Sequence, residues 1–193
     1  MERDYDIPDS KIGFYGTGLF GLSESEAASL RSIVGPYKDF FMAKLTPHHL
    51  SCRYLGYFDE YSQDEILKLS GVLAPIYKKY LPFECATGKL FGSWETRPDS
   101  NKRLLMIEIN SPRFQSLHDE IFAATKNYRV FEEVEVKNVR PHVSIGRIKD
   151  EINIVPDELL KKMESQVSHF TLAFTKAYIF TPGGVKEIGL DAV

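Results

Sequence analysis

The sequence has few cysteines and no long hydrophobic run. Its 193 residues contain two cysteines, Cys52 and Cys85, without a Cys-x-x-Cys spacing, so we expect neither a zinc ribbon nor a disulfide framework. Both are expected to be small buried residues. No stretch approaches the roughly 20 apolar residues of a membrane span. Low-complexity segments and repeats of about 20 to 50 residues are also absent, which excludes repeat architectures.

The chain also lacks an excess of positive charge. Lysine and arginine total 24 against 27 acidic residues, which gives a net charge of −3 and argues against a protein that coats nucleic acid nonspecifically. The first ten residues are acidic and contain no apolar run, so we expect no signal or transit peptide and a cytoplasmic location. We predict a flexible arm at residues 1–10 and one bilobal domain over 11–193.

Helical and strand patterns alternate along the chain without the continuous apolar runs of parallel strands. The class expected is therefore α+β, with two mostly antiparallel sheets and helices on the outside. Strands are predicted over 11–20, 49–57, 83–94, 103–110, 129–136, 142–148 and 170–180, with a short hairpin arm at 185–190. Helices are predicted over 23–34, where Ser23 and Glu26 form a capping box, and over 64–80, 111–128 and 156–167. Pro75 predicts a kink or a break in the second helix.

Two histidine motifs carry the strongest chemical signal. His49-Leu50-Ser51 and His142-Val143-Ser144 each follow a proline closely and each open a predicted strand. Because residues i and i+2 of a strand share a face, each motif places an imidazole beside a hydroxyl and turns the middle residue toward the core. The motifs lie 93 residues apart, as expected if two lobes each contribute a strand to a shared cleft.

Basic residues surround both motifs. Residues 40–58 contain Lys44 and Arg53 and no acid, and residues 136–149 contain four cations and no acid. This pattern favours an anionic ligand. Of the other histidines, we expect His169 at a helix-to-strand junction, and His48 and His118 as surface or packing residues.

Two imidazoles and two hydroxyls suit phosphodiester chemistry on ribose. One neutral histidine can take a proton from the attacking oxygen while the other, protonated, gives one to the leaving oxygen. Ser51 and Ser144 would donate hydrogen bonds to the phosphoryl oxygens. The arrangement requires no metal or cofactor, and neither histidine has an acidic or cysteine neighbour at ligand spacing.

The segments HLSCRYLG and PHVSIGR resemble the paired signatures of the 2H phosphoesterase superfamily, in particular the 2′-5′ RNA ligases and RNA 2′,3′-cyclic phosphodiesterases. The resemblance implies a bilobal fold with pseudo-twofold symmetry around a central cleft. It also implies that His49 and His142 are catalytic and that Ser51 and Ser144, where many relatives have threonine, bind phosphate. Arg147, five residues after His142, matches a recurrent arginine. Strict alternation would turn Arg147 away, so its role requires a bulge near Gly146.

Aromatic residues near the motifs are candidates for base stacking. Tyr54, Phe91 and Trp94 qualify by position, although aromatic residues in strands are more often part of a core. The polar loop at 96–102 is a candidate gate to the site.

A competing motif is the literal G-x-G-x-x-G of Gly16, Gly18 and Gly21, which is the dinucleotide-binding fingerprint. That interpretation needs a second strand ending in an acid about 20 residues on, and none follows. We therefore interpret the glycines as bends in a first strand.

The sequence predicts a phosphoesterase that acts on RNA ends or small nucleotides, by 2′,3′-cyclic phosphate hydrolysis or 2′-5′ phosphodiester cleavage. The alternative is a nucleotide- or RNA-binding module that kept the fold without turnover. The exact substrate and the assignment of acid and base between the histidines stay open. We expect a monomer with no membrane partner.

Overall fold

The computed structural model describes residues 14–44, 47–93, 103–128, 140–152, 155–167 and 169–190. The expected N-terminal arm, the strand expected at 129–136, Trp94 and the loop at 96–102 lie outside these residues.

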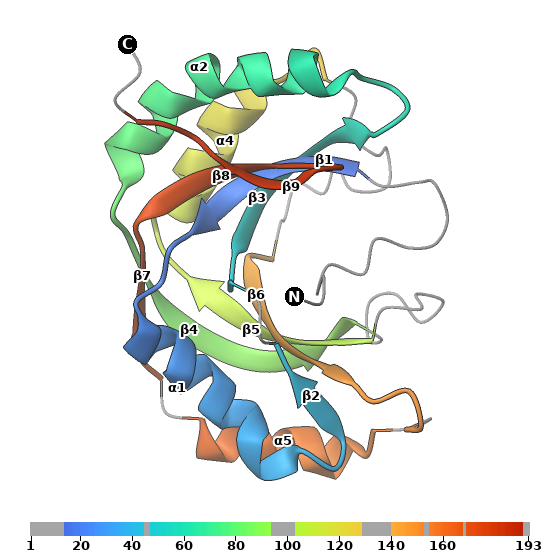
Figure 1. Ribbon diagram of the computed structural model, residues 1–193. Helices are drawn as coiled ribbons and strands as arrows, with labels where there is room; N and C mark the ends of the chain where they lie inside the picture. Colours follow the sequence, from blue (N-terminus) through green and yellow to red (C-terminus); the bar gives the residue numbers. More distant parts are fainter. Residues whose placement is uncertain are drawn as a thin grey trace.

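Strands and helices follow one another in nearly the predicted order (Figure 1). The strands are β1 Phe14–Phe20, β2 Phe41–Ala43, β3 Leu50–Tyr57, β4 Phe83–Gly92, β5 Leu104–Asn110, β6 His142–Ile148, β7 Thr171–Phe174, β8 Lys176–Thr181 and β9 Gly184–Glu187. The helices are α1 Glu24–Val34, α2 Gln63–Tyr80, α4 Phe114–Ala124 and α5 Asp157–Gln166, with a 3-10 turn, η1, at Gly35–Tyr37.

Within the described residues, nine strands form one curled antiparallel sheet in the order β7-β4-β5-β6-β3-β1-β8-β9, with β2 also paired to β6. Helices α2 and α4 cover the outside of the β3-β1-β8 half, and α1 and α5 lie outside the other half (Figure 1). Strands β3 and β6 join the halves through a single residue pair, Leu50 with Val143. The α+β class is confirmed, and the two expected sheets are two halves of one continuous sheet.

Helices α1 and α2 both begin at capping boxes. Ser23 and Glu26 form the first, as predicted, and Ser62 with Glu65 forms the second. Of the kink or break predicted at Pro75, the break is wrong, because α2 continues through Pro75 to Tyr80. Buried residues on both sides of Pro75 pack against the core and hold the two segments on the sheet.

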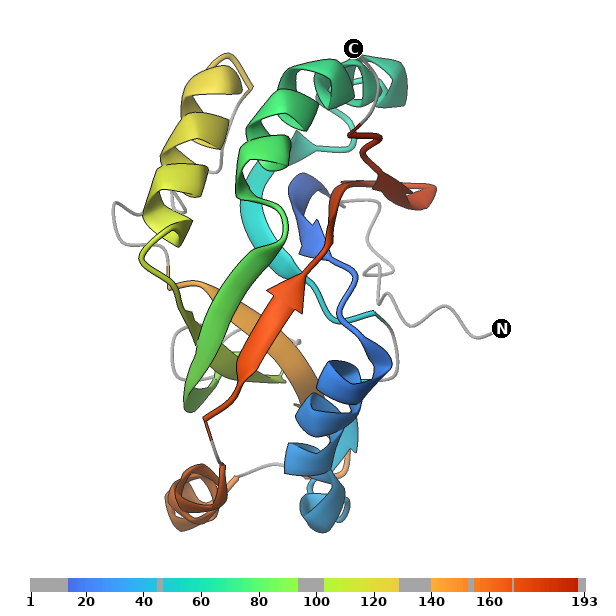
Figure 2. The same ribbon diagram turned by 90° about the vertical axis from the view of Figure 1, so that its left-hand side faces the viewer.

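The single strand predicted over 170–180 is two strands. Strand β7 pairs with β4 and β8 pairs with β1, so the chain passes from one half of the sheet to the other at Thr175 (Figure 2). The Thr175 hydroxyl donates to the Gly21 carbonyl at 2.6 Å and fixes this crossing. Thr175 and Lys176 are both exposed, which interrupts the alternation of buried and exposed positions.

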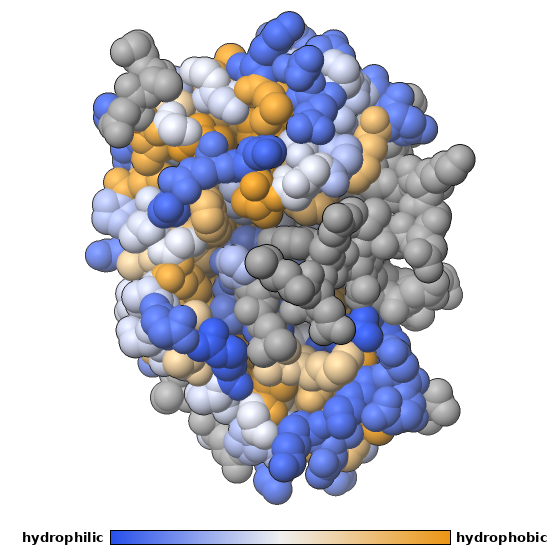
Figure 3. Space-filling model, viewed as in Figure 1, coloured by the Kyte–Doolittle hydropathy of each residue, from blue (hydrophilic) through white to orange (hydrophobic). Residues whose placement is uncertain are grey.

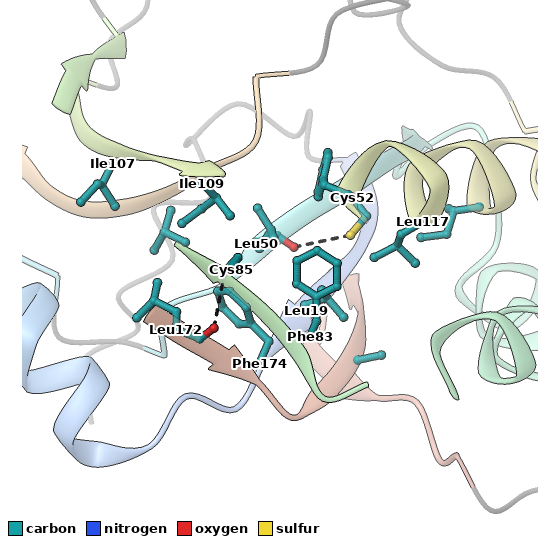
Figure 4. Packing of buried hydrophobic residues seen from close by; sticks show 14 of the residues in the cluster. Leu19, Leu50, Cys52, Phe83, Cys85, Ile107, Ile109, Leu117, Leu172 and Phe174 are labelled. Carbon is teal, nitrogen blue, oxygen red and sulfur yellow. Dashed lines mark hydrogen bonds between the residues drawn. The ribbon is translucent and has the colours of Figure 1, made fainter. Parts of the chain in front are cut away.

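The core anchors both motifs through their middle residues. Leu50 and Val143 are fully buried, as predicted, and Leu50 lies among Leu19, Phe83 and Phe174 (Figure 4). Burying an aliphatic side chain of this size contributes about 1.5–3 kcal/mol, which opposes any rotation of either motif. Cys52 and Cys85 are buried and free, as expected, and burial raises the pKa of each thiol to about 12.

Among the described residues, no helix is long and apolar enough to cross a membrane. Hydrophilic residues gather along the upper and lower rims of the face in Figure 3.

Candidate active site

The Leu50–Val143 pair sets the geometry of the site. Antiparallel register around this pair brings His49 near Ser144 and Ser51 near His142, because neighbours on the two strands run in opposite directions. His49, Ser51, His142 and Ser144 are all half-buried, whereas the residues between them are buried. The structure thus brings the four motif residues together across two adjacent strands.

A bulge in β6 returns Arg147 to the face of the site. The register with β5 passes from Gly146 to Ser144 without a partner for Ile145. Ile145 and Gly146 are both buried, so Arg147 is half-buried on the same side as His142 and Ser144. The bulge required for Arg147 is present. Gly146 also permits the close approach of β2, because a Cβ there would lie 2.8 Å from the Met42 carbonyl.

Strand β3 repeats this pattern. Its register with β1 passes from Arg53 to Ser51 without a partner for Cys52, and Cys52 and Arg53 are both buried. Tyr54, five residues after His49, therefore shares the face of His49 and Ser51 and occupies the place that Arg147 has in β6. The pseudo-twofold relation thus extends past the motifs to bulges at equivalent positions.

The two imidazoles are held in similar ways. Nδ1 of His142 lies 2.9 Å from the Arg140 carbonyl and must donate to it. The carbonyl of Pro47, two residues before His49, also forms a hydrogen bond with the His49 imidazole. A proton on Nδ1 leaves Nε2 of the neutral His142 ring as its basic nitrogen.

His49 differs from His142 in having a lysine beside it. Nζ of Lys44 lies 3.3 Å from Nδ1 of His49. Burial, the Lys44 charge and the nearby His142 together lower the pKa of His49 from 6.5 to about 3, against the opposing effect of the Pro47 hydrogen bond. His49 is therefore neutral at physiological pH.

The cationic surroundings expected from the sequence are mostly paired with acids. Arg140 pairs with Glu108 of β5, while Arg147 pairs with Asp150 and Lys149 with Glu151, two acids just beyond the basic segment. Arg53 is turned away by the β3 bulge and donates to the Phe122 carbonyl and the Thr125 hydroxyl at the end of α4. These cations therefore contribute less positive charge to the site than their number in the sequence indicates.

His48 has a connecting role that the sequence did not reveal. It is buried, and its Nδ1 lies 3.2 Å from the Ser144 carbonyl, so it links the chain before the first motif to the second motif. Burial lowers the pKa of His48 to about 4. His169 lies between α5 and β7, as expected, with Nδ1 2.9 Å from the Thr87 carbonyl.

A pocket opens beside His49. Its lining residues are Gly16, His49, Ser51, Tyr54, Tyr178, Phe180 and Val185. Its volume of about 160 Å³ is below the roughly 300–1,000 Å³ of sites for whole ligands, so it suits one part of a nucleotide.

Gly16 of β1 lines this pocket, and Gly18 lies between two of its other lining residues. Gly16 pairs with Tyr54 and Phe180, and Gly18 pairs with Ser51 and Tyr178. Paired residues on neighbouring strands share a face, so the missing side chains leave room between β3 and β8. Because β1 is antiparallel to both neighbours, the dinucleotide-binding interpretation is excluded.

The aromatic residues expected to stack on a base differ in whether they face the pocket. Tyr54 lines the pocket, whereas Phe91 is buried beneath the Arg140 guanidinium, 3.7 Å from its ring centre. Phe91 packs its ring edge-on against His142 instead. Among the described residues, no cluster of three or more potential ligands could hold a metal ion.

Comparisons with known proteins agree with this architecture. No protein-family model matches the sequence, and neither does any curated protein. Among solved structures, TT0787 of Thermus thermophilus is 17% identical with a TM-score of 0.52, covering 91% of this chain and 93% of that one. E. coli LigT complexed with 3′-AMP is 15% identical with a TM-score of 0.51, covering 91% and 94%. Kluyveromyces marxianus Usb1 is 13% identical with a TM-score of 0.51, covering 95% and 100%.

The fold of this chain is therefore that of the 2H phosphoesterases, as its motifs predicted.

Proposed function

We propose that the protein is a metal-independent phosphodiesterase that acts on RNA ends or small nucleotides. The observation that carries the proposal is the Leu50–Val143 pair, which brings two histidines and two serines into one site. Each imidazole forms a hydrogen bond with a backbone carbonyl two residues before it, and this contact orients both rings in the site. Proton transfer at two points of one reaction needs two such groups, whereas binding alone needs neither.

In hydrolysis of a 2′,3′-cyclic phosphate, His49 is the general base and His142 the general acid. Burial and Lys44 keep the His49 ring neutral, so His49 accepts the proton of the attacking water. The new P–O bond forms as the bond to one ribose oxygen breaks, and His142 protonates that oxygen. The product is a phosphomonoester. Ser51 and Ser144 donate hydrogen bonds to the non-bridging oxygens as charge builds on them.

A 2′-5′ linkage is cleaved at the same site with the neighbouring ribose hydroxyl as nucleophile. The hydroxyl loses its proton to one imidazole, the leaving 5′ oxygen gains one from the other, and a cyclic phosphate end results. The pocket lined by Tyr54 and Phe180 would hold the base or ribose next to the reacting phosphorus. The known LigT complex with 3′-AMP supports a nucleotide as ligand.

The proposal is tested with EDTA present, using a nucleoside 2′,3′-cyclic phosphate and a 2′-5′ oligoadenylate in parallel. His49→Ala and His142→Ala are compared with wild type and with His169→Ala. His169 is the matched control, because its imidazole also binds a backbone carbonyl but lies between α5 and β7. We expect wild type and the control to turn over at least one substrate and both site variants to lose activity while folded.

Two other results would contradict the proposal. Nucleotide binding without turnover would identify a binding module, and turnover that survives both site substitutions would place the chemistry elsewhere.

A further inference from the structure

Two rows of paired residues cross the sheet at equivalent places in its two halves. In one half, Tyr178 of β8 pairs with Gly18 of β1, which pairs with Ser51 of β3. In the other half, Phe91 of β4 pairs with Met106 of β5, which pairs with Ser144 of β6. Each row therefore runs from an aromatic residue to the serine of one motif.

The aromatic residue of each row contacts the histidine of that half of the sheet in the same geometry. The ring of Tyr178 lies edge-on to His49, with centroids 5.6 Å apart and an interplanar angle of 80°. Phe91 meets His142 at 5.8 Å and 83°. Tyr178 and Phe91 are thus equivalent in position and differ by one hydroxyl group.

The middle residue of each row decides what that hydroxyl can reach. Met106 places a side chain between Phe91 and Ser144, whereas Gly18 has no side chain between Tyr178 and Ser51. A Cβ at Gly18 would lie 2.9 Å from the Tyr178 hydroxyl, so the glycine is what permits the phenol to lean over β1. The phenol oxygen lies 3.5 Å from Oγ of Ser51, at the long end of a hydrogen bond, and Tyr178 lines the pocket with His49.

We propose that Tyr178 is a further catalytic residue, whose phenol donates a hydrogen bond to a non-bridging phosphoryl oxygen of the substrate beside Ser51. The inference rests on the proposed function and deepens it. The His49 half of the site then has two hydroxyl donors and the His142 half has one from its motif. A pseudo-symmetric site becomes asymmetric, so the two non-bridging oxygens of the bound phosphate are recognised differently.

The test is Tyr178→Phe, which removes one oxygen atom and creates in this row the ring that the other row already has. The matched control is Tyr15→Phe, since Tyr15 is a buried tyrosine of β1 whose hydroxyl donates to the Tyr61 carbonyl at 3.0 Å. Because a donor to a developing oxyanion acts mainly in the transition state, we expect kcat to fall by about 100-fold in Tyr178→Phe, with a smaller change in KM. The control should keep wild-type kinetics. Wild-type kinetics in Tyr178→Phe would overturn the inference.

A second measurement separates contact with substrate from support of the His49 ring. The two diastereomers of a nucleoside 2′,3′-cyclic phosphorothioate carry sulfur, a weak acceptor, at one or the other non-bridging position. Wild type should discriminate between them, and Tyr178→Phe should reduce that discrimination. Discrimination unchanged in the variant would mean that the phenol touches neither oxygen.

The inference is also separable from the proposed function. If wild type hydrolyses nothing, the proposed function fails, and binding of adenosine 2′-monophosphate by calorimetry still tests the phenol. A Kd raised about 10-fold in Tyr178→Phe, and unchanged in Tyr15→Phe, would support the phosphate contact, since one hydrogen bond to a charged group contributes about 1.5 kcal/mol or more. Equal affinities would overturn it.

Discussion

Nδ1 of His48 lies 3.2 Å from the carbonyl oxygen of Ser144, and this contact completes the edge of β6 between its two partner strands. Gly146 pairs with β2, the Ile145 carbonyl accepts from the Lys44 N–H at 2.9 Å, and Val143 pairs with β3. The Ser144 carbonyl lies between these pairings, and the His48 imidazole donates a hydrogen bond to it. The side chain of His48 thus donates to β6, which carries the second motif, where a backbone N–H of a partner strand would otherwise do so.

We predict that His48→Leu lowers kcat by roughly 10- to 100-fold, because displacements of about 1 Å in a catalytic group have effects of this size. The change removes the donor to Ser144 but keeps an apolar side chain in a buried position. His48→Asn should restore most of the activity, since its amide can donate in place of Nδ1. Steady-state kinetics of the two variants decide this. Equal activities in both, or a similar loss in His169→Leu, would show that the contact does not position the motifs.

The low pKa of His48 predicts a loss of stability in mild acid. The unfolded chain binds a proton at His48 below about pH 6.5, whereas the folded protein does so only near pH 4. As the pH is lowered between these two values, protonation of His48 in the unfolded chain reduces the free energy of unfolding by about 1.4 kcal/mol per pH unit. The lowered pKa of His49 has an effect in the same direction. Urea unfolding at pH 7, 5.5 and 4.5 measures the slope. His48→Asn should have a shallower slope than wild type, and an unchanged slope would assign the effect to other groups.

Lys44 is predicted to set the acidic limb of the pH–rate profile. Its ammonium, 3.3 Å from Nδ1 of His49, opposes protonation of that ring. Lys44→Met removes the charge, so the pKa of His49 should rise and the acidic limb of kcat/KM should move to higher pH. Lys38→Met serves as the control, because Lys38 is an exposed residue just after η1. An acidic limb that stays in place would mean that His49 is not the base.

Gly16 and Gly18 should respond differently to alanine. A Cβ at Gly18 would lie 2.2 Å from the Leu50 carbonyl, so Gly18→Ala should destabilise the protein by about 1–3 kcal/mol or more. At Gly16 the nearest atom would be 3.4 Å away, so Gly16→Ala should fold normally. Its methyl group would occupy the floor of the pocket and raise KM. Thermal unfolding of both variants tests the effect on stability, and their KM values test the effect on the pocket. A Gly18→Ala protein as stable as wild type would contradict the role of Gly18 in strand packing.

Arg147 is predicted to bind the anionic substrate. Its partner Asp150 is exposed and lies 3.4 Å away, so exchanging it for a phosphate costs little. Arg147→Gln should raise KM by about 10-fold, because a hydrogen bond to a charged group contributes about 1.5–3 kcal/mol. Arg31→Gln, which breaks the exposed pair with Glu24 on α1, is the control. An unchanged KM in Arg147→Gln would leave this arginine without a role at the site.

The sequence by itself determined most of the elements, though not β2 or the division between β7 and β8, and it singled out the four motif residues. Period-two alternation set the faces of His49 and Ser51 and buried Leu50, and a capping box set the start of α1, because these are local properties of the backbone. The pairing of the two motifs also followed from their chemistry, since each is an imidazole beside a hydroxyl.

The tertiary structure alone decided which residues surround the motifs. Arg53 lies in the basic segment but binds the end of α4, and Arg140 lies beside the second motif but pairs with Glu108. The bulges at Cys52 and Ile145 depend on the registers with β1 and β5, which no local pattern encodes. Tyr178, 127 residues from Ser51, reaches it only because the chain crosses at Thr175 and Gly18 lies between them. Register and strand order are long-range properties, so they appear only when the sheet is assembled.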